Sequence, residues 1–401
     1  MRDTLLGLEP KDWDVATDAP PQRVRQLFPR TQAVGAAFGV ILVRQGESVV
    51  EVATFRTDVS YEDGRRPTAV KFTTAEEDAK RRDFTINGLF LDPVENKVID
   101  YVGGQDDLKN RVLRAIGNAA ERFAEDHLRL LRAVRFAARF GLTIEPATSF
   151  AMKTSAPALR RISQERIAEE LRLMLVPRTR RDAWKMLWAY RLTHVIMRLL
   201  PEGDRAPDVL DERRSLMLHL NDERPLPFGL VLAAAVLCYR SVALGDREDV
   251  LLSLATKPEV QRAAGALRHA LRISNDELAE MEGVLLALPV LLGDETPSVA
   301  KMKRALATPT AGSMIKLLDA IARSERFEQR VAWLRERFAS MMQDDVAPNP
   351  LITGDDLTAD GFQPGPMFKR VLNDVYDAQL EDRVKTREEA LALARETFAR
   401  G

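Results

Sequence analysis

The stretch that decides the fold is NAAERFAEDHLRLLRAVRFAARFGL, residues 118–142. Its apolar residues recur at the spacing of a helical face, and Gly141 offers a natural stop; they are Phe123, Leu128, Leu131, Val134, Phe136 and Ala138. The pattern predicts one helix through this stretch. Similar patterns continue to residue 400, so the last three-quarters of the chain should be almost wholly helical.

The first 115 residues read differently. Two strand-like runs, VILV (40–43) and VVEVATF (49–55), are joined by QGES and predict an antiparallel hairpin. INGLFLD (86–92) and NKVIDYV (96–102) predict two more strands. We therefore expect an α+β fold: a small α/β head over 1–115, a helical neck over 116–200, and a helical body and tail over 201–401.

Composition narrows the function classes. The chain has 401 residues, with 59 Lys or Arg against 60 Asp or Glu, so its net charge of −1 excludes a uniformly basic nucleic-acid binder and an acidic disordered tail. Apolar runs are interrupted before the roughly 18 to 20 residues that a membrane span needs. The single cysteine, Cys238, excludes an internal disulfide and a thiolate metal cluster. We expect a cytoplasmic protein without a membrane partner.

Three acids are candidate metal ligands. Asp12 and Asp14 are two residues apart, so on a strand both carboxylates would point to one face and reach one divalent cation. The alternative is a loop with two solvated acids. Glu51 lies within the apolar run VVEVATF, where it either joins these acids or faces solvent.

A fourth group of charges lies on the expected helix 118–142. Asp126, Arg129 and Arg132 are spaced by three residues and form one polar ridge, which Arg135 continues. The alternative is a solvated face with ion pairs inside the helix. KRRDFTIN (80–87) and DYVGG (100–104) are the other polar motifs.

These motifs resemble a known family. RDTLLG…DWDVAT, RRDFTINGLF, DYVGG and RFAEDHLRLLRAVRF, in this order, are similar to motifs A to D of the class II tRNA nucleotidyltransferases and bacterial poly(A) polymerases, and SQERIAEEL (163–171) is similar to the fifth. The resemblance covers residues 1 to about 175. It implies an enzyme that adds CCA to the 3′ end of tRNA from CTP and ATP, and it implies no DNA partner. A CC-adding or A-adding enzyme, a poly(A) polymerase and a non-catalytic RNA-binding relative are the alternatives.

The resemblance also implies roles for the head residues. Asp12 and Asp14 would bind catalytic Mg²⁺, and Glu51 matches the position of the third acid. Arg2 and Arg82 would hold the phosphates or the ribose of the nucleotide, a role that suits a guanidinium group.

On the helix, the resemblance implies that Asp126 and Arg129 read the base. A carboxylate accepts from the exocyclic amine of C or A, whereas U and G present a carbonyl there. Arg132 and Arg135 would complete the nucleotide pocket.

The sequence departs from the family pattern at its start, whereas the segment 56–80 lies where the family has a flexible loop. The family has a helix and a strand ending in Gly-Gly before the residues matched by Met1–Asp3. The alternatives are a start assigned too far downstream, a trimmed chain and the loss of part of the phosphate cradle. We expect the first, with such a segment encoded upstream. The charged segment 56–80 should be a mobile lid, in which Arg65, Arg66 and Pro67 form either an RNA contact or a solvated turn.

Overall fold

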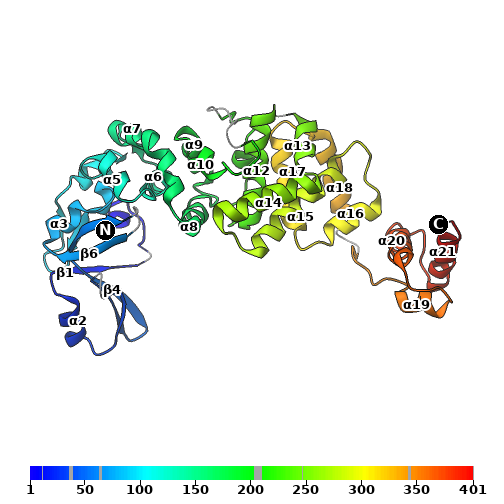
Figure 1. The fold of residues 1–401 in the computed structure, drawn as a ribbon, viewed down its shortest axis with the longest axis horizontal. Helices are drawn as coiled ribbons and strands as arrows, with labels where there is room; N and C mark the ends of the chain where they lie inside the picture. The colour runs from blue at the N-terminus through cyan, green and yellow to red at the C-terminus, as the bar shows by residue number, and fades with distance from the viewer. Residues whose placement is uncertain are drawn as a thin grey trace. The chain divides into compact units, whose positions relative to one another are not determined.

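The computed structural model describes residues 1–10, 12–35, 39–62, 66–202, 210–245, 247–341 and 345–400. The chain divides into two compact units (Figure 1). The first comprises Met1–Arg198 with Ala270–Arg272, and the second comprises Leu199–His269 with Ile273–Gly401. The first unit carries the strands, and the second is built from helices, as the sequence predicts.

A four-stranded sheet follows the short helix α1 (Arg2–Leu5). Its strands are β1 (Val15–Thr17), β2 (Thr31–Gly35), β3 (Val40–Gln45) and β4 (Ser48–Thr54), in the order β1-β4-β3-β2. The antiparallel β3–β4 pair is the predicted hairpin, and β1 pairs with β4 in parallel. Apolar side chains of β3 and β4 pack with Val24 of α2 (Pro21–Leu27) in a small core.

Two more hairpins complete the head. The strands β7 (Leu89–Asp92) and β8 (Lys97–Asp100) pair as predicted. The strands β5 (Arg56–Glu62) and β6 (Arg66–Phe72) also pair, and α3 (Ala75–Lys80) follows them. The charged segment 56–80 therefore contains regular secondary structure in its described residues, and its assignment as a mobile lid stays a prediction. Arg65 lies outside the described residues.

The stretch 118–142 forms two helices instead of the single predicted one. The helix α5 (Ala119–Glu125) ends where Asp126 adopts an extended backbone, with φ −147° and ψ 105°, and α6 (Arg129–Phe140) begins three residues later. The Asp126 carboxylate accepts a hydrogen bond from the Leu128 amide at 3.0 Å. Such local side-chain bonds compete with the helical ladder. The predicted core residues Phe123, Leu131 and Val134 are fully buried.

The remaining elements of the first unit connect the sheet to the helices. They are η2 (Thr85–Asn87), α4 (Gly104–Lys109), β9 (Val112–Leu113), β10 (Thr143–Ile144), α7 (Pro146–Ser155), η3 (Ala156–Arg161), α8 (Gln164–Met174), α9 (Arg180–Ala189) and α10 (Leu192–Ile196). The helix α8 packs against α6 and brings residues of the fifth motif to the helix that carries the predicted ridge.

In the described residues of the second unit, all the regular secondary structure is helical. Its helices up to Met341 are α11 (Leu216–His219), α12 (Phe228–Leu244), α13 (Glu248–Leu254), α14 (Lys257–Leu271), α15 (Asn275–Leu292), α16 (Val299–Leu306), α17 (Ala311–Arg323) and α18 (Glu328–Met341), the end of α14 belonging to the first unit. Three later helices, α19 (Gly354–Ala359), α20 (Pro366–Leu380) and α21 (Arg387–Arg400), share an apolar core of their own. Within the described ranges, no helix is long and apolar enough to span a membrane.

Candidate active site

The three predicted acids lie at the start of the parallel pair β1–β4. Val15 of β1 is the register partner of Val52 of β4, so Asp14 and Glu51 each directly precede one member of this pair. The spacing of Asp12 and Asp14 suggested a strand, but both residues lie in the irregular segment before β1. All three side chains are exposed.

The three acids are near enough for their charges to repel one another. Loss of solvent, and then repulsion from Asp12, raise the pKa of Asp14, although Arg82 and the chain's terminal amine partly oppose the shift. Loss of solvent and repulsion from Asp14 likewise raise the pKa of Glu51. Mutual repulsion of this kind disfavours the ionised carboxylates, and a bound cation would relieve it. This donor set fits a hard divalent cation, which prefers oxygen ligands.

The acids form an open group. In the part of the chain that the structure describes, no three His, Cys, Asp or Glu side chains are already gathered closely enough to hold a metal ion. Mg²⁺ commonly binds through one or two carboxylates and completes its shell with water and substrate phosphates. An open pair of acids is compatible with that mode of binding.

The two arginines predicted to hold the nucleotide meet at Asn87, the last residue of η2. Arg2 donates through Nη1 to the side-chain oxygen of Asn87, and Arg82 donates through Nη1 to its main-chain oxygen at 2.8 Å. The Arg82 guanidinium also bonds the Asp78 carboxylate at 3.0 Å and lies 4.5 Å from the centre of the Phe90 ring. Arg82 lies near the acids, because its charge partly opposes the upward shift in the pKa of Asp14, and Arg2 shares the Asn87 partner of Arg82.

A buried ion pair connects this turn to α6. Arg132 donates through Nε to Asp83 Oδ2 at 2.7 Å, while Asp83 Oδ1 accepts from the Asn87 side-chain amide at 2.8 Å. Burial alone would raise the pKa of Asp83, but Arg132 and the Asn87 amide together lower it below its usual value. The Asp83 carboxylate is therefore ionised, and it fixes Arg132 against the turn.

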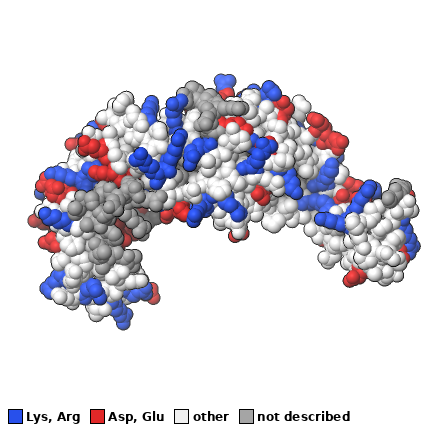
Figure 2. Space-filling model, viewed as in Figure 1, with Lys and Arg blue, Asp and Glu red and all other residues white. Residues whose placement is uncertain are grey.

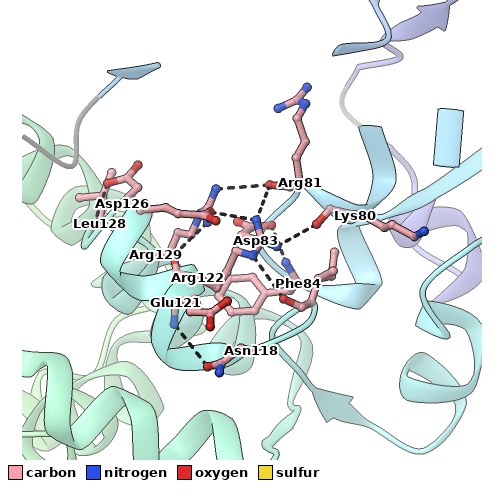
Figure 3. A network of polar contacts seen from close by, with 12 residues as sticks. Lys80, Arg81, Asp83, Phe84, Asn118, Glu121, Arg122, Asp126, Leu128 and Arg129 are labelled. Carbon is pink, nitrogen blue, oxygen red and sulfur yellow. Dashed lines mark hydrogen bonds and ion pairs between the residues drawn. The ribbon is translucent and has the colours of Figure 1, made fainter. Parts of the chain in front are cut away.

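The predicted base readers, Asp126 and Arg129, lie on either side of the α5–α6 break and have separate partners. Arg129 is buried and donates through Nη1 to Glu125 Oε2 at 2.5 Å and to the Arg122 carbonyl at 2.9 Å. Its Nη2 reaches the Arg81 carbonyl at 3.4 Å (Figure 3). Asp126 instead forms an ion pair with Arg166 of α8. Among the described residues, Asp126 and Arg129 therefore have different ion-pair partners.

The last predicted site residue, Arg135, lies one turn beyond Arg132 on α6. Its Nε is 2.7 Å from Oε2 of Glu170, which α8 supplies. Burial raises the pKa of Glu170 despite this neighbour, and burial lowers the pKa of Arg135. The Phe136 ring lies 4.6 Å from the Arg135 guanidinium. Arg135 is thus held between α8 and an aromatic face.

The DYVGG motif supports the same turn without carrying a reacting group. Asp100 accepts hydrogen bonds from four successive main-chain amides, those of residues 102–105. The backbone of Gly104 passes so close to η2 that a Cβ there would lie 2.2 Å from the Thr85 carbonyl oxygen. Thr85 in turn bonds Asp107 of α4 at 2.7 Å. The motif therefore positions the turn that ends in Asn87.

Sequence reasoning missed five residues of this network: Asp83, Asn87, Glu125, Arg166 and Glu170. All five lie within the motifs quoted from the sequence, but their partners could not be assigned from spacing. Asp83 and Arg132 are 49 residues apart, and Asp126 and Arg166 are 40 apart. The sequence signal that could have found them is their charged or polar side chains in largely apolar segments, because a buried polar group without a partner is costly.

Comparisons with known proteins identify the family of the chain. Residues 1–114 match the poly A polymerase head domain, residues 141–205 the RNA- and SrmB-binding site of polymerase A, and residues 246–394 the tRNA nucleotidyltransferase domain 2. A CCA-adding enzyme of Streptococcus pneumoniae is 31% identical over 394 residues, which cover 98% of this chain and 90% of that protein.

Two solved structures extend the comparison. The Bacillus stearothermophilus CCA-adding enzyme in complex with CTP superposes with a TM-score of 0.73 at 27% identity, over 100% of this chain and 92% of that one. The Thermotoga maritima CCA-adding enzyme complexed with tRNA has the same fold, with a TM-score of 0.64 at 18% identity over 99% and 88% of the two chains. Fold and matches together define a nucleotidyltransferase. The chain belongs to the family of CCA-adding tRNA nucleotidyltransferases.

Proposed function

We propose that this protein adds the sequence CCA to the 3′ ends of tRNA from CTP and ATP, releases pyrophosphate and uses no nucleic-acid template. The observation that carries the proposal is the segment Arg81–Asn87, which contacts both Arg2 and the helix α6. It holds Arg2 and Arg82 near the acids, and it bonds Arg129 and Arg132 of α6. A nucleotide bound there would have its phosphates near the acids and its base near the α5–α6 turn.

The chemistry assigned to the acids is phosphoryl transfer. Nucleotidyltransferases of this family use a divalent metal ion, and Asp12 and Asp14, with Glu51 beside them, would hold Mg²⁺ here. When bound, the ion lowers the pKa of the attacking hydroxyl and offsets charge on the phosphates. The RNA 3′ hydroxyl bonds to the α-phosphorus and gives its proton to solvent, while the bond from the α-phosphorus to the bridging oxygen breaks and pyrophosphate leaves with that oxygen. Arg2 and Arg82 orient the phosphates or the ribose.

Base selection is assigned to Asp126 and Arg129. Asp126 accepts from the exocyclic amine that C and A share, and Arg129 donates to a ring nitrogen or carbonyl. U and G place a carbonyl where the amine should be, which would leave that carbonyl facing a carboxylate. Arg132 and Arg135 keep the helix in position through Asp83 and Glu170.

Each of the three predicted domains has a proposed role. We assign residues 1–115 to the catalytic head, 116–200 to the neck that reads the base, and 201–401 to the body and tail that bind tRNA in the cytoplasm. Figure 2 shows both basic and acidic side chains on the visible face. Basic side chains among acidic ones on this face can form local contacts with an RNA backbone.

A substrate panel tests the proposal. Purified protein with Mg²⁺ receives tRNA ending before CCA, tRNA ending in CC, or an unrelated RNA, with CTP and ATP supplied separately. We expect CTP to extend the first tRNA and ATP the second, with no extension of the unrelated RNA. Long A-tails on unrelated RNA would show a poly(A) polymerase. Binding of tRNA without any incorporation would show a non-catalytic relative.

A further inference from the structure

The helix α8 presents two opposite charges, one turn apart, to the base-reading segment. Arg166 pairs with Asp126 on the α5–α6 turn, and Glu170 pairs with Arg135 on α6. Each pair joins unlike charges, so α8 fits this segment in one register. The Asp126 pair is the more informative one, because Asp126 is the residue assigned to contact the base.

Arg166 holds both oxygens of the Asp126 carboxylate. Its Nη2 donates to Oδ2 at 2.7 Å and its Nη1 to Oδ1 at 3.3 Å, while the Leu128 amide donates to Oδ1 at 3.0 Å. A carboxylate offers about four acceptor positions, two on each oxygen. Both positions of Oδ1 are therefore filled, and the one that remains open lies on Oδ2.

We propose that Arg166 is a specificity-determining positioning residue, which acts through Asp126 by leaving one oriented acceptor, on Oδ2, for the base amine. The inference rests on the proposed function. The Asp126 side chain is 16% exposed and that of Arg166 33%, so the pair stays accessible to a nucleotide. A bidentate guanidinium fixes the plane of a carboxylate as well as its place.

The consequence concerns selectivity more than binding. An acceptor oxygen held in one position accepts a hydrogen bond from a base amine there and repels a base carbonyl oxygen. Without Arg166, only the Leu128 amide holds the carboxylate, which can then turn about its terminal bond and tolerate a base that lacks the amine. C and U differ at this group, so the ratio of kcat/KM for CTP to that for UTP reports the orientation of Asp126.

The test uses the full chain with tRNA ending before CCA, and compares wild type with Arg166→Ala and Arg166→Lys. We expect the CTP-to-UTP ratio to fall about tenfold in Arg166→Ala, the loss of roughly one hydrogen bond to a charged group. Arg166→Lys keeps the charge without the fork and should fall between the two. Arg160→Ala, at an exposed arginine of η3, is the control that should keep the wild-type ratio.

A second background separates orientation from general damage. In Asp126→Ala, the further change Arg166→Ala should leave the ratio where Asp126→Ala alone puts it, because Arg166 then has no carboxylate to orient. An active Arg166→Lys or Arg166→Ala with the wild-type ratio would overturn the inference, even if its melting temperature drops. Failure of the wild type to incorporate either nucleotide would instead overturn the proposed function on which the inference rests.

Discussion

The carboxylate of Asp83 and the guanidinium of Arg132 lie 2.7 Å apart, although 49 residues separate them in the chain. Asp83 belongs to the segment that holds Arg2 and Arg82, and Arg132 belongs to α6. The pair is buried on the Asp83 side. It joins the part of the site that would hold phosphates to the part that would read the base.

Breaking this pair should be costly at neutral pH. In Asp83→Asn, the partly buried Arg132 loses the negative charge that it pairs with. We therefore expect the free energy of unfolding to fall by about 3 kcal/mol at pH 7. The lowered pKa of Asp83 means that its stabilisation is present above the usual carboxyl pKa of 3.8 and is lost as the pH falls through the folded value. Urea titrations at pH 7 and near pH 3.5 should show the deficit of the variant shrinking in acid.

Glu170→Gln is the matched comparison for that variant. Burial raises the pKa of Glu170, so ionising it opposes folding and neutralising it should cost much less than Asp83→Asn, in spite of the Arg135 partner. If both variants lose the same stability at pH 7, the different electrostatic roles given to the two pairs are wrong.

Replacing Asp14, which directly precedes the parallel β1–β4 pair, should raise stability and abolish activity. The pKa of Asp14 is raised, so its ionised form opposes folding at pH 7, and Asp14→Asn should melt at a higher temperature than wild type in metal-free buffer. The gain should vanish below about pH 4, where both states of wild type bind the proton. The same variant should incorporate no nucleotide, and Mg²⁺ should raise its melting temperature less than that of wild type.

The Asp12→Ala plus Asp14→Ala protein tests the metal assignment by activity. We expect no incorporation with an unchanged circular dichroism spectrum, because both side chains are exposed and support no core. Turnover retained in this variant would refute their assignment as metal ligands.

Gly104 should not accept a side chain. The added Cβ of Gly104→Ala would meet the Thr85 carbonyl oxygen at 2.2 Å, so we expect a loss of about 1 to 3 kcal/mol in stability and a fall in incorporation as Asn87 moves. Gly265→Ala, in the middle of α14 with no atom within 4 Å of its Cβ, is the control and should keep full activity. Equal tolerance of both changes, measured by urea titration and incorporation, would argue against a positioning role for Gly104.

Much of this fold was predictable, for identifiable reasons. The β3–β4 hairpin follows from alternation around QGES, and the buried face of α6 follows from the spacing of Leu131 and Val134. The break at Asp126 was not predictable from periodicity, because a single side-chain bond to the Leu128 amide decides it. The pairing of β5 with β6 was missed because backbone hydrogen bonds, which carry no sequence signature, organise a strongly charged segment.

The candidate site was predictable as a set of residues but not as a network. Motif order placed Arg82, Asp126 and Arg132 in one protein region, yet their contacts run through Asp78, Arg166 and Asp83. Ion pairs between distant segments depend on tertiary packing. Spacing along one helix could therefore suggest that the charges form a ridge but could not show that partners from other elements hold each of them.

The most direct test of the central claim is to sequence the 3′ ends of a tRNA lacking CCA after reaction with the purified protein, Mg²⁺ and all four nucleoside triphosphates. Side chains that select C and A in place of a template should give tRNA ending in CCA, with growth stopping there and with U and G absent. Ends that carry U or G at the level of C and A, or open-ended A-tails, would contradict this account.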